Sequence, residues 1–302
     1  MKKIEIKKQY LEGDEYYSNK TDKKTIVLHH TAGSHRPDWV FSSWDRDRTK
    51  GGRPLRVATQ FVIGGKSTRD GNTDWDGVVV QGLPVEQWAH HLGTKNSNNR
   101  KLNEQSIGIE ICNYGPLVKS VKGEYFTYVN SKVPEEDVID LGKNWRGYRY
   151  YQKYTDKQIE SVKFLIEKYS LEYGIDVCKG MVELFDSKQS LESLSILETQ
   201  EFLNSKGYFG LNGKVLTEDG ITGGNTKYAV RTYNDADRSD WGPFEFNKLA
   251  NHGGVGIWSH TNYRKDKFDV YPYPPLIEML KSLSFVYLNF CGYICFIKKK
   301  HL

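Results

Sequence analysis

Four short apolar runs in the first third of the chain predict buried β-strands. They are rich in β-branched residues and lie at residues 25–28, 57–63, 77–81 and 106–112. In the fourth run, isoleucines at alternate positions share one face, which puts Glu110 on the other face. The first run leads directly into His29 and His30. We therefore expect a sheet whose strand ends carry polar side chains.

Residues 155–174 have the hydrophobic period of an amphipathic helix. Thr155 and Gln158 form a capping-box pattern at its start, and Gly174 marks its end. The apolar stripe consists of Ile159, Val162, Leu165, Ile166 and Tyr169. Before this helix, residues 113–154 are rich in Tyr, Lys and Gly, and we expect loops and a hairpin there.

The second half of the chain first has a helical pattern and then a further apolar run that predicts a strand. Residues 186–235 predict an amphipathic helix that stops at Gly207, a turn at Asp219-Gly220, and a second helix from about Asn225. An apolar run at residues 254–259 predicts a strand that leads into His260, and proline begins a predicted helix at residues 274–281. This order predicts one discontinuous domain, residues 1–185 and 236–284, with residues 186–235 inserted.

Composition narrows the class of protein only slightly. Hydrophobic residues make up 38% and charged residues 27%, which is typical of a soluble globular chain. The net charge of +5 mildly favours acidic partners such as wall polymers, nucleic acid or anionic lipid. Four cysteines without a CxxC pair favour a reduced state and argue against a structural zinc site.

The two ends of the sequence suggest where the protein is made. The first residues are basic but lack an apolar run, so we expect no signal peptide and synthesis in the cytoplasm. Residues 285–302 form a tail of unknown role, an apolar run followed by lysines. As a helix, the run at residues 285–297 would span roughly 20 Å, short of the ~30 Å core of a bilayer. We therefore do not expect this tail to associate with a membrane.

The histidines and two late aspartates suggest a metal site. His29 and His30 follow the first strand, His260 follows the late strand, and Asp266 and Asp269 come soon after it. Two imidazoles and one carboxylate leave one position open, which is the ligand set of a catalytic zinc site. The alternative is that these histidines only pack and form hydrogen bonds.

Several segments together resemble a known family. The segments IVLHHTAGS, VATQFVIGG, WAHHLG, SIGIEICN and WSHTNYRKDKFDVYP occur in the order of the type-2 N-acetylmuramoyl-L-alanine amidases, which include phage endolysins and animal peptidoglycan recognition proteins. The similar parts are residues 24–113, 155–174 and 254–281. The resemblance implies an α/β fold with a mixed central sheet flanked by helices. Residues 186–235 are similar to a small three-helix peptidoglycan-binding module, although an ordinary helical insertion is the alternative.

The resemblance also implies roles for individual residues. The ligands of Zn²⁺ would be His29, His260 and Asp269, with Asp266 as the weaker candidate for the third. The catalytic residues would be Glu110 and Lys267. The residues expected at the substrate are His91, His30 and Thr59, and His30 could instead pack behind the metal. The family's common DPGP sequence is here Asp269-Val270-Tyr271-Pro272, which departs from the family pattern directly after the expected third ligand.

These resemblances imply a function. We expect zinc-dependent hydrolysis of the amide between N-acetylmuramic acid and L-alanine in bacterial peptidoglycan, by a monomeric phage or prophage endolysin that binds no nucleic acid. Such an enzyme would reach the wall through a holin pore or as part of a virion. The alternatives are a recognition protein that binds peptidoglycan without cutting it, and a wall-binding component of a phage tail.

Overall fold

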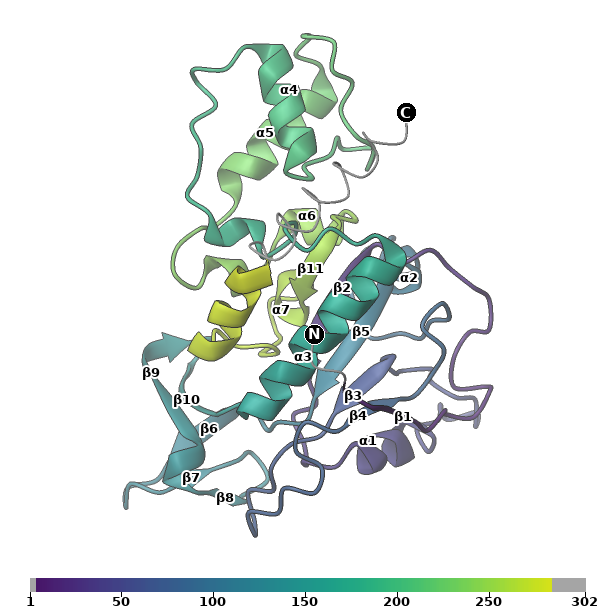
Figure 1. Cartoon of the computed structure of the whole chain (residues 1–302), viewed down its shortest axis with the longest axis vertical. Helices are drawn as coiled ribbons and strands as arrows, with labels where there is room; N and C mark the ends of the chain where they lie inside the picture. The colour runs from purple at the N-terminus through teal and green to yellow at the C-terminus, as the bar shows by residue number, and fades with distance from the viewer. Residues whose placement is uncertain (1–3, 284–302) are drawn as a thin grey trace, which may run out of the picture.

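The computed structural model describes residues 4–283, and a mixed six-stranded sheet lies at its centre (Figure 1). The strand order is β1-β4-β3-β5-β2-β11. β3 and β4 are antiparallel, whereas all other neighbours in this sheet are parallel. The strands are β1 (Ile6–Lys8), β2 (Thr25–His30), β3 (Phe61–Ile63), β4 (Val79–Gln81), β5 (Ser106–Ile111) and β11 (Gly256–Ser259). The predicted α/β class with a mixed central sheet is confirmed.

The predicted strand at residues 57–63 is shorter in the structure. Only Phe61–Ile63 pairs with the central sheet, as β3. Val57 instead forms an isolated bridge with His90, and the amide of Ala58 donates to the carbonyl of His90. The first part of the apolar run therefore pairs with the segment around His90, and the second part pairs with the central sheet. The hydrophobic pattern alone does not predict this division.

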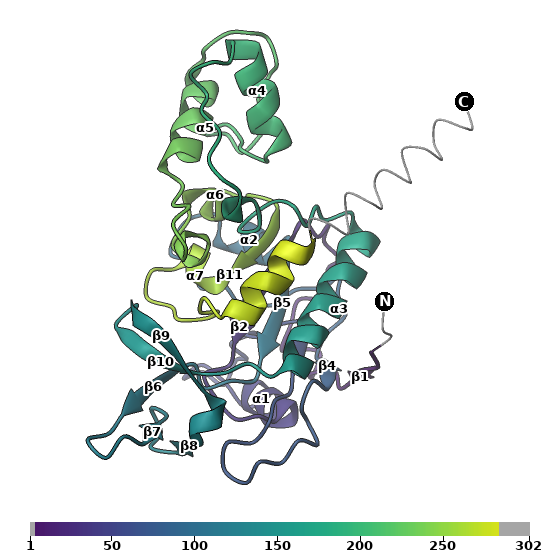
Figure 2. The ribbon, with the colours of Figure 1, turned by 60° about the vertical axis from the view of Figure 1, so that its left-hand side comes forward.

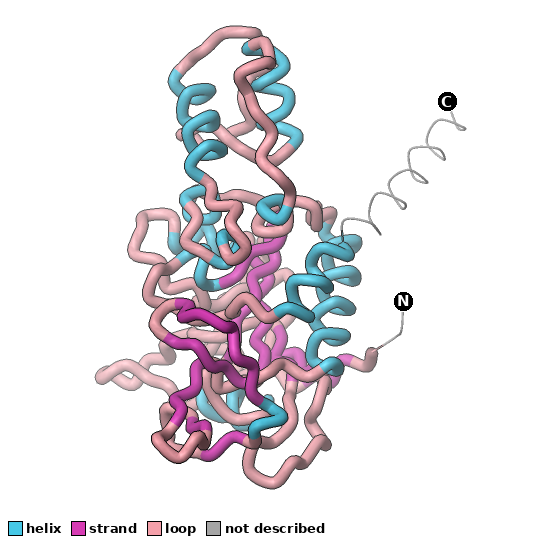
Figure 3. Tube along the Cα trace, turned by 90° about the vertical axis from the view of Figure 1, so that its left-hand side faces the viewer, coloured by secondary structure: helices cyan, strands magenta, loops and turns pink. Residues whose placement is uncertain are grey.

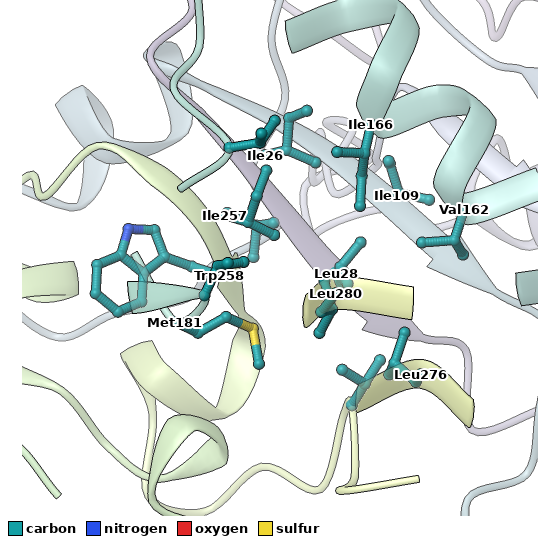
Figure 4. Packing of buried hydrophobic residues seen from close by; sticks show 14 of the residues in the cluster. Ile26, Leu28, Ile109, Val162, Ile166, Met181, Ile257, Trp258, Leu276 and Leu280 are labelled. Carbon is teal, nitrogen blue, oxygen red and sulfur yellow. The ribbon is translucent and has the colours of Figure 1, made fainter. Parts of the chain in front are cut away.

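Two helices cover one face of the central sheet. They are α3 (Asp156–Tyr173) and the helix at residues 274–283, which lie side by side in Figure 2. The predicted capping box of α3 is present, and Gly174 ends the helix with a left-handed φ of 66°. Figure 4 shows where both helices pack on the sheet; the residues labelled there on strands and helices include Ile26, Leu28, Ile109, Val162, Ile166, Leu276 and Leu280.

The opposite face of the sheet is covered only in part. Phe41 of α1 (Pro37–Trp44) packs there with Val62 and Val80. The remaining short helices are α2 (Asn99–Glu104), α6 (Lys248–Asn251), α7 (His260–Tyr263) and the 3-10 turns η1 (Glu135–Asp137), η2 (Glu183–Phe185) and η3 (Gly242–Phe244). The side chains of β2 and β5 that point to this face therefore remain available for a site.

Residues 116–152 form a second sheet rather than loops and one hairpin. Its order is β8-β7-β6-β10-β9, and every pairing is antiparallel. The strands are β6 (Pro116–Lys119), β7 (Tyr125–Phe126), β8 (Lys132–Val133), β9 (Val138–Trp145) and β10 (Tyr148–Gln152). Two of these strands have only two residues. Strands this short carry almost no periodic signal, which explains why the sequence did not reveal the sheet.

Residues 186–235, which we predicted to be an insertion, contain two α-helices where the resemblance implied three. They are α4 (Ile196–Ser205) and α5 (Gly224–Asp235), which lie apart from both sheets (Figures 1 and 3). Glycines with positive φ at Gly207, Gly213 and Gly220 interrupt the stretch between them, where a helix would be costly. Tyr208 and Tyr233 nevertheless belong to the same buried cluster as the central sheet. The segment therefore packs onto the rest of the chain.

The helix at residues 274–283 confirms the prediction for residues 274–281. Among residues 4–283, no helix has both the length and the apolar character needed to cross a membrane. The predicted tail at residues 285–302 lies outside the described residues.

Candidate active site

The central strands bring three predicted site residues to one place. His29 on β2 and Glu110 on β5 are direct partners in the parallel register. On the other side of β2, Ser259 of β11 is paired with Leu28, so the next residue, His260, stands beside His29. The imidazole rings of His29 and His260 have centroids 4.5 Å apart. Two neighbouring strand ends therefore supply two histidines, and a third strand supplies the carboxyl group.

Asp269 completes a group of three potential metal ligands. Its Oδ2 atom lies 2.8 Å from Nδ1 of His260 and 3.2 Å from Nδ1 of His29. The ligand atoms of His29, His260 and Asp269 all lie within 4.8 Å of one another, close enough to hold one ion. Within residues 4–283, no other group of three His, Cys, Asp or Glu side chains meets this condition. A tetrahedral zinc site with bonds of ~2.0–2.1 Å has ligand atoms ~3.3 Å apart. The observed spacing therefore fits a single Zn²⁺ ion.

The far nitrogen of each histidine is also engaged. Nε2 of His260 lies 2.9 Å from the carbonyl oxygen of Leu92, so it donates a hydrogen bond there and leaves Nδ1 to face Asp269. Nε2 of His29 lies 2.9 Å from Nδ1 of His91. His91 in turn bonds through Nε2 to the hydroxyl of Ser106, at 2.7 Å. Such outer hydrogen bonds select the tautomer that presents a lone pair to a metal.

Burial and mutual charge keep these groups in the protonation states that a metal needs. Burial lowers the pKa of His29 to about 4, and the nearby His260 acts in the same direction. Burial alone would raise the pKa of Asp269, but the adjacent imidazoles of His260 and His29 hold it well below its usual range. At neutral pH the site therefore contains a neutral His29 and a negative Asp269, as metal binding requires.

Glu110 faces the same space but has a different environment. Burial raises the pKa of its carboxyl group well above the usual range, and the charge of Asp269 acts in the same direction while Lys267 opposes it. Its Oε2 atom is buried and has no hydrogen-bond partner in the described part of the chain. Buried polar atoms normally have partners, so this oxygen is available to a water molecule or a substrate. A carboxyl group with a raised pKa is suited to accept and return a proton.

The site opens into a pocket of about 500 Å³. The central sheet supplies its floor, and the second sheet and the segment around Lys267 supply one wall. The lining residues contributed by that wall are Tyr114, Pro116, Val118, Tyr128, Tyr148, Asp266, Lys267, Phe268 and Asp269. Tyr148 and Phe268 stack edge to face with ring centroids 5.5 Å apart. The pocket is thus an open, partly aromatic groove with a polar centre.

The other predicted residues lie at the edges of this centre. His30, Thr59 and His91 all line the pocket. His30 is buried, and its Nδ1 lies 2.9 Å from the hydroxyl of Tyr154, on the face of the sheet that the helices cover. The carboxylate of Asp266 is mostly exposed and forms a two-pronged ion pair with Arg264. The structure therefore places Asp269, and not Asp266, beside the two histidines.

Sequence reasoning missed the residues that the second sheet contributes. Tyr114, Tyr128 and Tyr148 reach the pocket from the stretch where we expected loops and a hairpin. Arg146 also contacts the segment that carries Lys267, through the carbonyl oxygens of residues 264, 265 and 267. The pair Arg146-Gly147 between two aromatic runs could have located the turn of the expected hairpin. No local pattern could have indicated which distant carbonyl groups its guanidinium would meet.

Comparison with known proteins gives one family. The sequence model described as N-acetylmuramoyl-L-alanine amidase matches residues 19–183, which is more than half of the chain. The matched range includes His29 and Glu110 and ends just before the inserted segment, so His260 and Asp269 lie beyond it. No curated protein matches the chain.

Several solved structures are similar at low sequence identity. The structure of PlyL is 14% identical, covering 58% of this chain and 77% of that one, with a TM-score of 0.34. The amidase AmiD from E. coli, in complex with an anhydro-N-acetylmuramic acid peptide, is 20% identical over 53% of this chain and 48% of that one, with a TM-score of 0.32. The Staphylococcus aureus hydrolase AmiA is 9% identical over 94% of this chain and 87% of that one, with a TM-score of 0.36.

Proposed function

The chain belongs to the N-acetylmuramoyl-L-alanine amidase family, and we propose that it uses Zn²⁺ to hydrolyse the amide between N-acetylmuramic acid and L-alanine in peptidoglycan. One observation carries the zinc part of this proposal. Two imidazole nitrogens and one carboxylate oxygen converge beside a buried carboxyl oxygen that has no partner in the described residues. Three ligands with an open side, next to a proton acceptor, form the arrangement that amide hydrolysis requires.

His29, His260 and Asp269 would hold the ion. When bound, Zn²⁺ would lower the pKa of a water molecule towards ~7 and polarise the amide carbonyl group. His91 and the carbonyl group of Leu92 orient the two imidazoles from behind. Three protein ligands are the usual number in a catalytic zinc site, and the fourth position is taken by water or substrate.

Glu110 is the residue that moves the proton. In its carboxylate form, which the charge of Lys267 favours, Glu110 accepts a proton from the attacking water through Oε2, and burial makes that carboxylate a stronger base. The proton then passes to the nitrogen of the leaving L-alanine, which would otherwise depart as an unstable anion. Lys267, also in the pocket, places its ammonium group where negative charge develops on the carbonyl oxygen.

The decisive experiment follows the products of purified peptidoglycan. We expect new L-alanine amino termini with Zn²⁺ present and none after the metal is removed by a chelator. Glu110→Gln serves as the inactive control that still folds. Release of reducing sugar ends instead would indicate a glycosidase. No new termini with Zn²⁺ bound would indicate a protein that binds the wall without cutting it, and the enzymatic proposal would then be wrong.

We further propose that the inserted segment, residues 186–235, binds the wall polymer. It exposes apolar side chains that a soluble surface would not need, among them Leu197 at 41% and Ile221 at 66% exposure. Leu197 lies close to Gly220, the chain neighbour of Ile221, so both residues belong to the same end of the segment. Exposed apolar groups that cluster in this way are typical of binding surfaces.

A double variant tests the role of the segment without removing buried residues. Leu197→Ser with Ile221→Ser should weaken binding of the Glu110→Gln protein to whole cell walls, while the same pair in the active protein should cleave small soluble muramoyl peptides normally. A matched control is Leu171→Ser on α3, which is 54% exposed and lies outside the segment. Equal loss of both activities would show that the segment supports the catalytic fold instead.

The biological setting is the last part of the proposal. We infer a lytic role of the endolysin type, with release through a holin pore or delivery by a virion. Expression in a bacterial host should lyse cells when a holin is co-expressed and leave them intact without it. Lysis that never depends on a holin, together with recovery of the protein in purified virions, would favour the virion-associated role.

A further inference from the structure

The turn between β9 and β10 carries an arginine in an unusual conformation. Trp145 and Tyr148 are register partners, so Arg146 and Gly147 form a two-residue turn. Both have positive φ, 49° for Arg146 and 91° for Gly147, which is the pattern of a type I′ turn. Asn, Asp or Gly normally occupies the first position, because other residues pay roughly 1–2 kcal/mol for this conformation. The side chain of Arg146 must therefore supply something that the turn itself does not require.

The guanidinium of Arg146 binds the segment that carries Lys267 and Asp269, residues 264–269, which we call the catalytic loop. Nη1 donates to the carbonyl oxygens of Arg264 and Lys265, both at 3.1 Å, and to that of Lys267. Nη2 lies 3.4 Å from the carbonyl oxygen of Thr261, just before the loop. One side chain thus forms hydrogen bonds with four backbone carbonyl groups between residues 261 and 267.

A carboxylate holds the guanidinium in place. Glu245 accepts from Nη2 of Arg146 at 3.0 Å through Oε2, and from Nε1 of Trp145 at 2.7 Å through Oε1. The side chain of Arg146 is only 9% exposed, so its charge depends on this partner and on the carbonyl groups. Glu245 directly follows η3, in the segment between residue 235 and β11. This segment, the β9–β10 hairpin and the catalytic loop therefore all contact the guanidinium of Arg146.

The other contacts of the catalytic loop lie at its two ends and at Phe268, which stacks on Tyr148. No regular secondary structure is present from residue 264 to residue 269. Arg264 pairs with Asp266 inside the loop and donates to the carbonyl oxygen of Gly93. The far end is tied by the amide of Thr261, which donates to the carbonyl oxygen of Asp269 at 3.0 Å. Without the guanidinium, the carbonyl groups of residues 265 and 267 would lose the bonds that the structure gives them.

We propose that Arg146 is a positioning residue, which fixes the catalytic loop so that Asp269 meets the two histidines and Lys267 faces the pocket. The effect on catalysis rests on the proposed function. The contacts of Arg146 with the catalytic loop do not depend on it. The second sheet is therefore part of the active site in two ways, as a wall of the pocket and as the source of this contact. A side chain more than a hundred residues away in sequence sets the third metal ligand.

Arg146→Lys tests the proposal because it keeps the positive charge and loses the forked geometry. We expect the dissociation constant for Zn²⁺ to rise about 10- to 100-fold, as when an outer contact of a metal ligand is lost. Hydrogen exchange at the Thr261 amide should be at least about 10-fold faster in the metal-free protein, while amides of β2 keep their protection. In the active enzyme, kcat should fall more than KM rises.

Arg149→Lys is the matched control, since Arg149 lies in the same hairpin and pairs with Asp140 on the exposed surface. It should leave all three measurements unchanged. If Arg146→Lys fails to fold, Glu245→Gln provides a milder variant with the same expected direction. Addition of millimolar guanidinium to Arg146→Ala should restore part of the metal affinity.

The outcomes separate this inference from the proposed function. Normal metal affinity and normal Thr261 exchange in Arg146→Lys would overturn the positioning role, whatever the activity. If the wild-type protein binds Zn²⁺ but releases no L-alanine termini, the proposed function fails, and the metal and exchange measurements still test Arg146.

Discussion

His29 and Glu110 are register partners on adjacent parallel strands, so the imidazole and the carboxyl group lie on the same face of the sheet. Partners in a parallel ladder are held by the backbone hydrogen bonds of both strands. The distance between these two side chains therefore does not depend on any loop. Asp269 and Lys267, by contrast, come from a segment without regular structure, which must be positioned by side chains.

Replacement of Glu110 by glutamine should separate chemistry from metal binding. The amide keeps the shape of the side chain but cannot accept the proton, so we expect turnover to fall at least about 100-fold. Zn²⁺ affinity should stay unchanged, because Glu110 is not in the ligand group. The control Glu124→Gln alters a surface carboxylate that pairs with Lys132 and should keep full turnover. Survival of activity in Glu110→Gln would mean that another group accepts the proton.

Lys267→Met should lower kcat by about 10²- to 10³-fold, with KM and Zn²⁺ affinity little changed. The methionine keeps the length of the side chain and removes the charge that stabilises the developing oxyanion. Lys265→Met, two residues earlier, is the control, because Lys265 is exposed and absent from the pocket lining. Equal losses in both variants would point to a general effect of loop charge. Steady-state kinetics on a soluble muramoyl peptide distinguish these results.

His91 offers a test between two roles. We expected it at the substrate, yet its Nδ1 lies 2.9 Å from Nε2 of the proposed ligand His29. If orientation of His29 dominates, His91→Leu should weaken Zn²⁺ binding about 10- to 100-fold. His91→Asn, whose side-chain oxygen can stand near the position of Nδ1, should lose less. A rise in KM with unchanged metal affinity would instead support contact with the substrate.

The stability of the metal-free protein should fall as the pH is lowered from about 6.5 to 4. Burial lowers the pKa of both His29 and His30 to about 4, whereas an unfolded chain has histidine pKa values near ~6.5. Between these values the unfolded state binds more protons, so acid favours unfolding by on the order of 3 kcal/mol for each histidine. The sign is therefore a gain of stability as pH rises through this window.

Glu110 contributes with the opposite sign to this pH dependence. Its raised pKa means that the folded protein holds a proton which the unfolded chain has lost, so its contribution weakens stability as pH rises. Urea unfolding of the Glu110→Gln protein between pH 7 and pH 4 isolates the histidines. His30→Asn in that background should reduce the pH dependence by about a third, because burial also lowers the pKa of His29 and of His91. A flat profile would contradict neutral buried histidines.

Local patterns in the sequence predicted the parts of this protein that depend on nearby residues. Thr155, Gln158 and Gly174 predicted the limits of α3, because helix caps act within one turn of the chain. Alternation in β5 put Glu110 on the face opposite the isoleucines, because successive side chains of a strand point to opposite sides. The order of motifs predicted the family, which the family match over residues 19–183 shows.

Tertiary structure alone decided how distant segments meet. It separates Asp269, which reaches His29 and His260, from Asp266, which turns outward to Arg264. It also builds the second sheet, two strands of which are too short for a periodic signal. Contacts such as that of Arg146 with the catalytic loop join residues far apart in the chain. Their partners depend on the path of the whole backbone, and that path is set by the packing of the core rather than by any local pattern of residues.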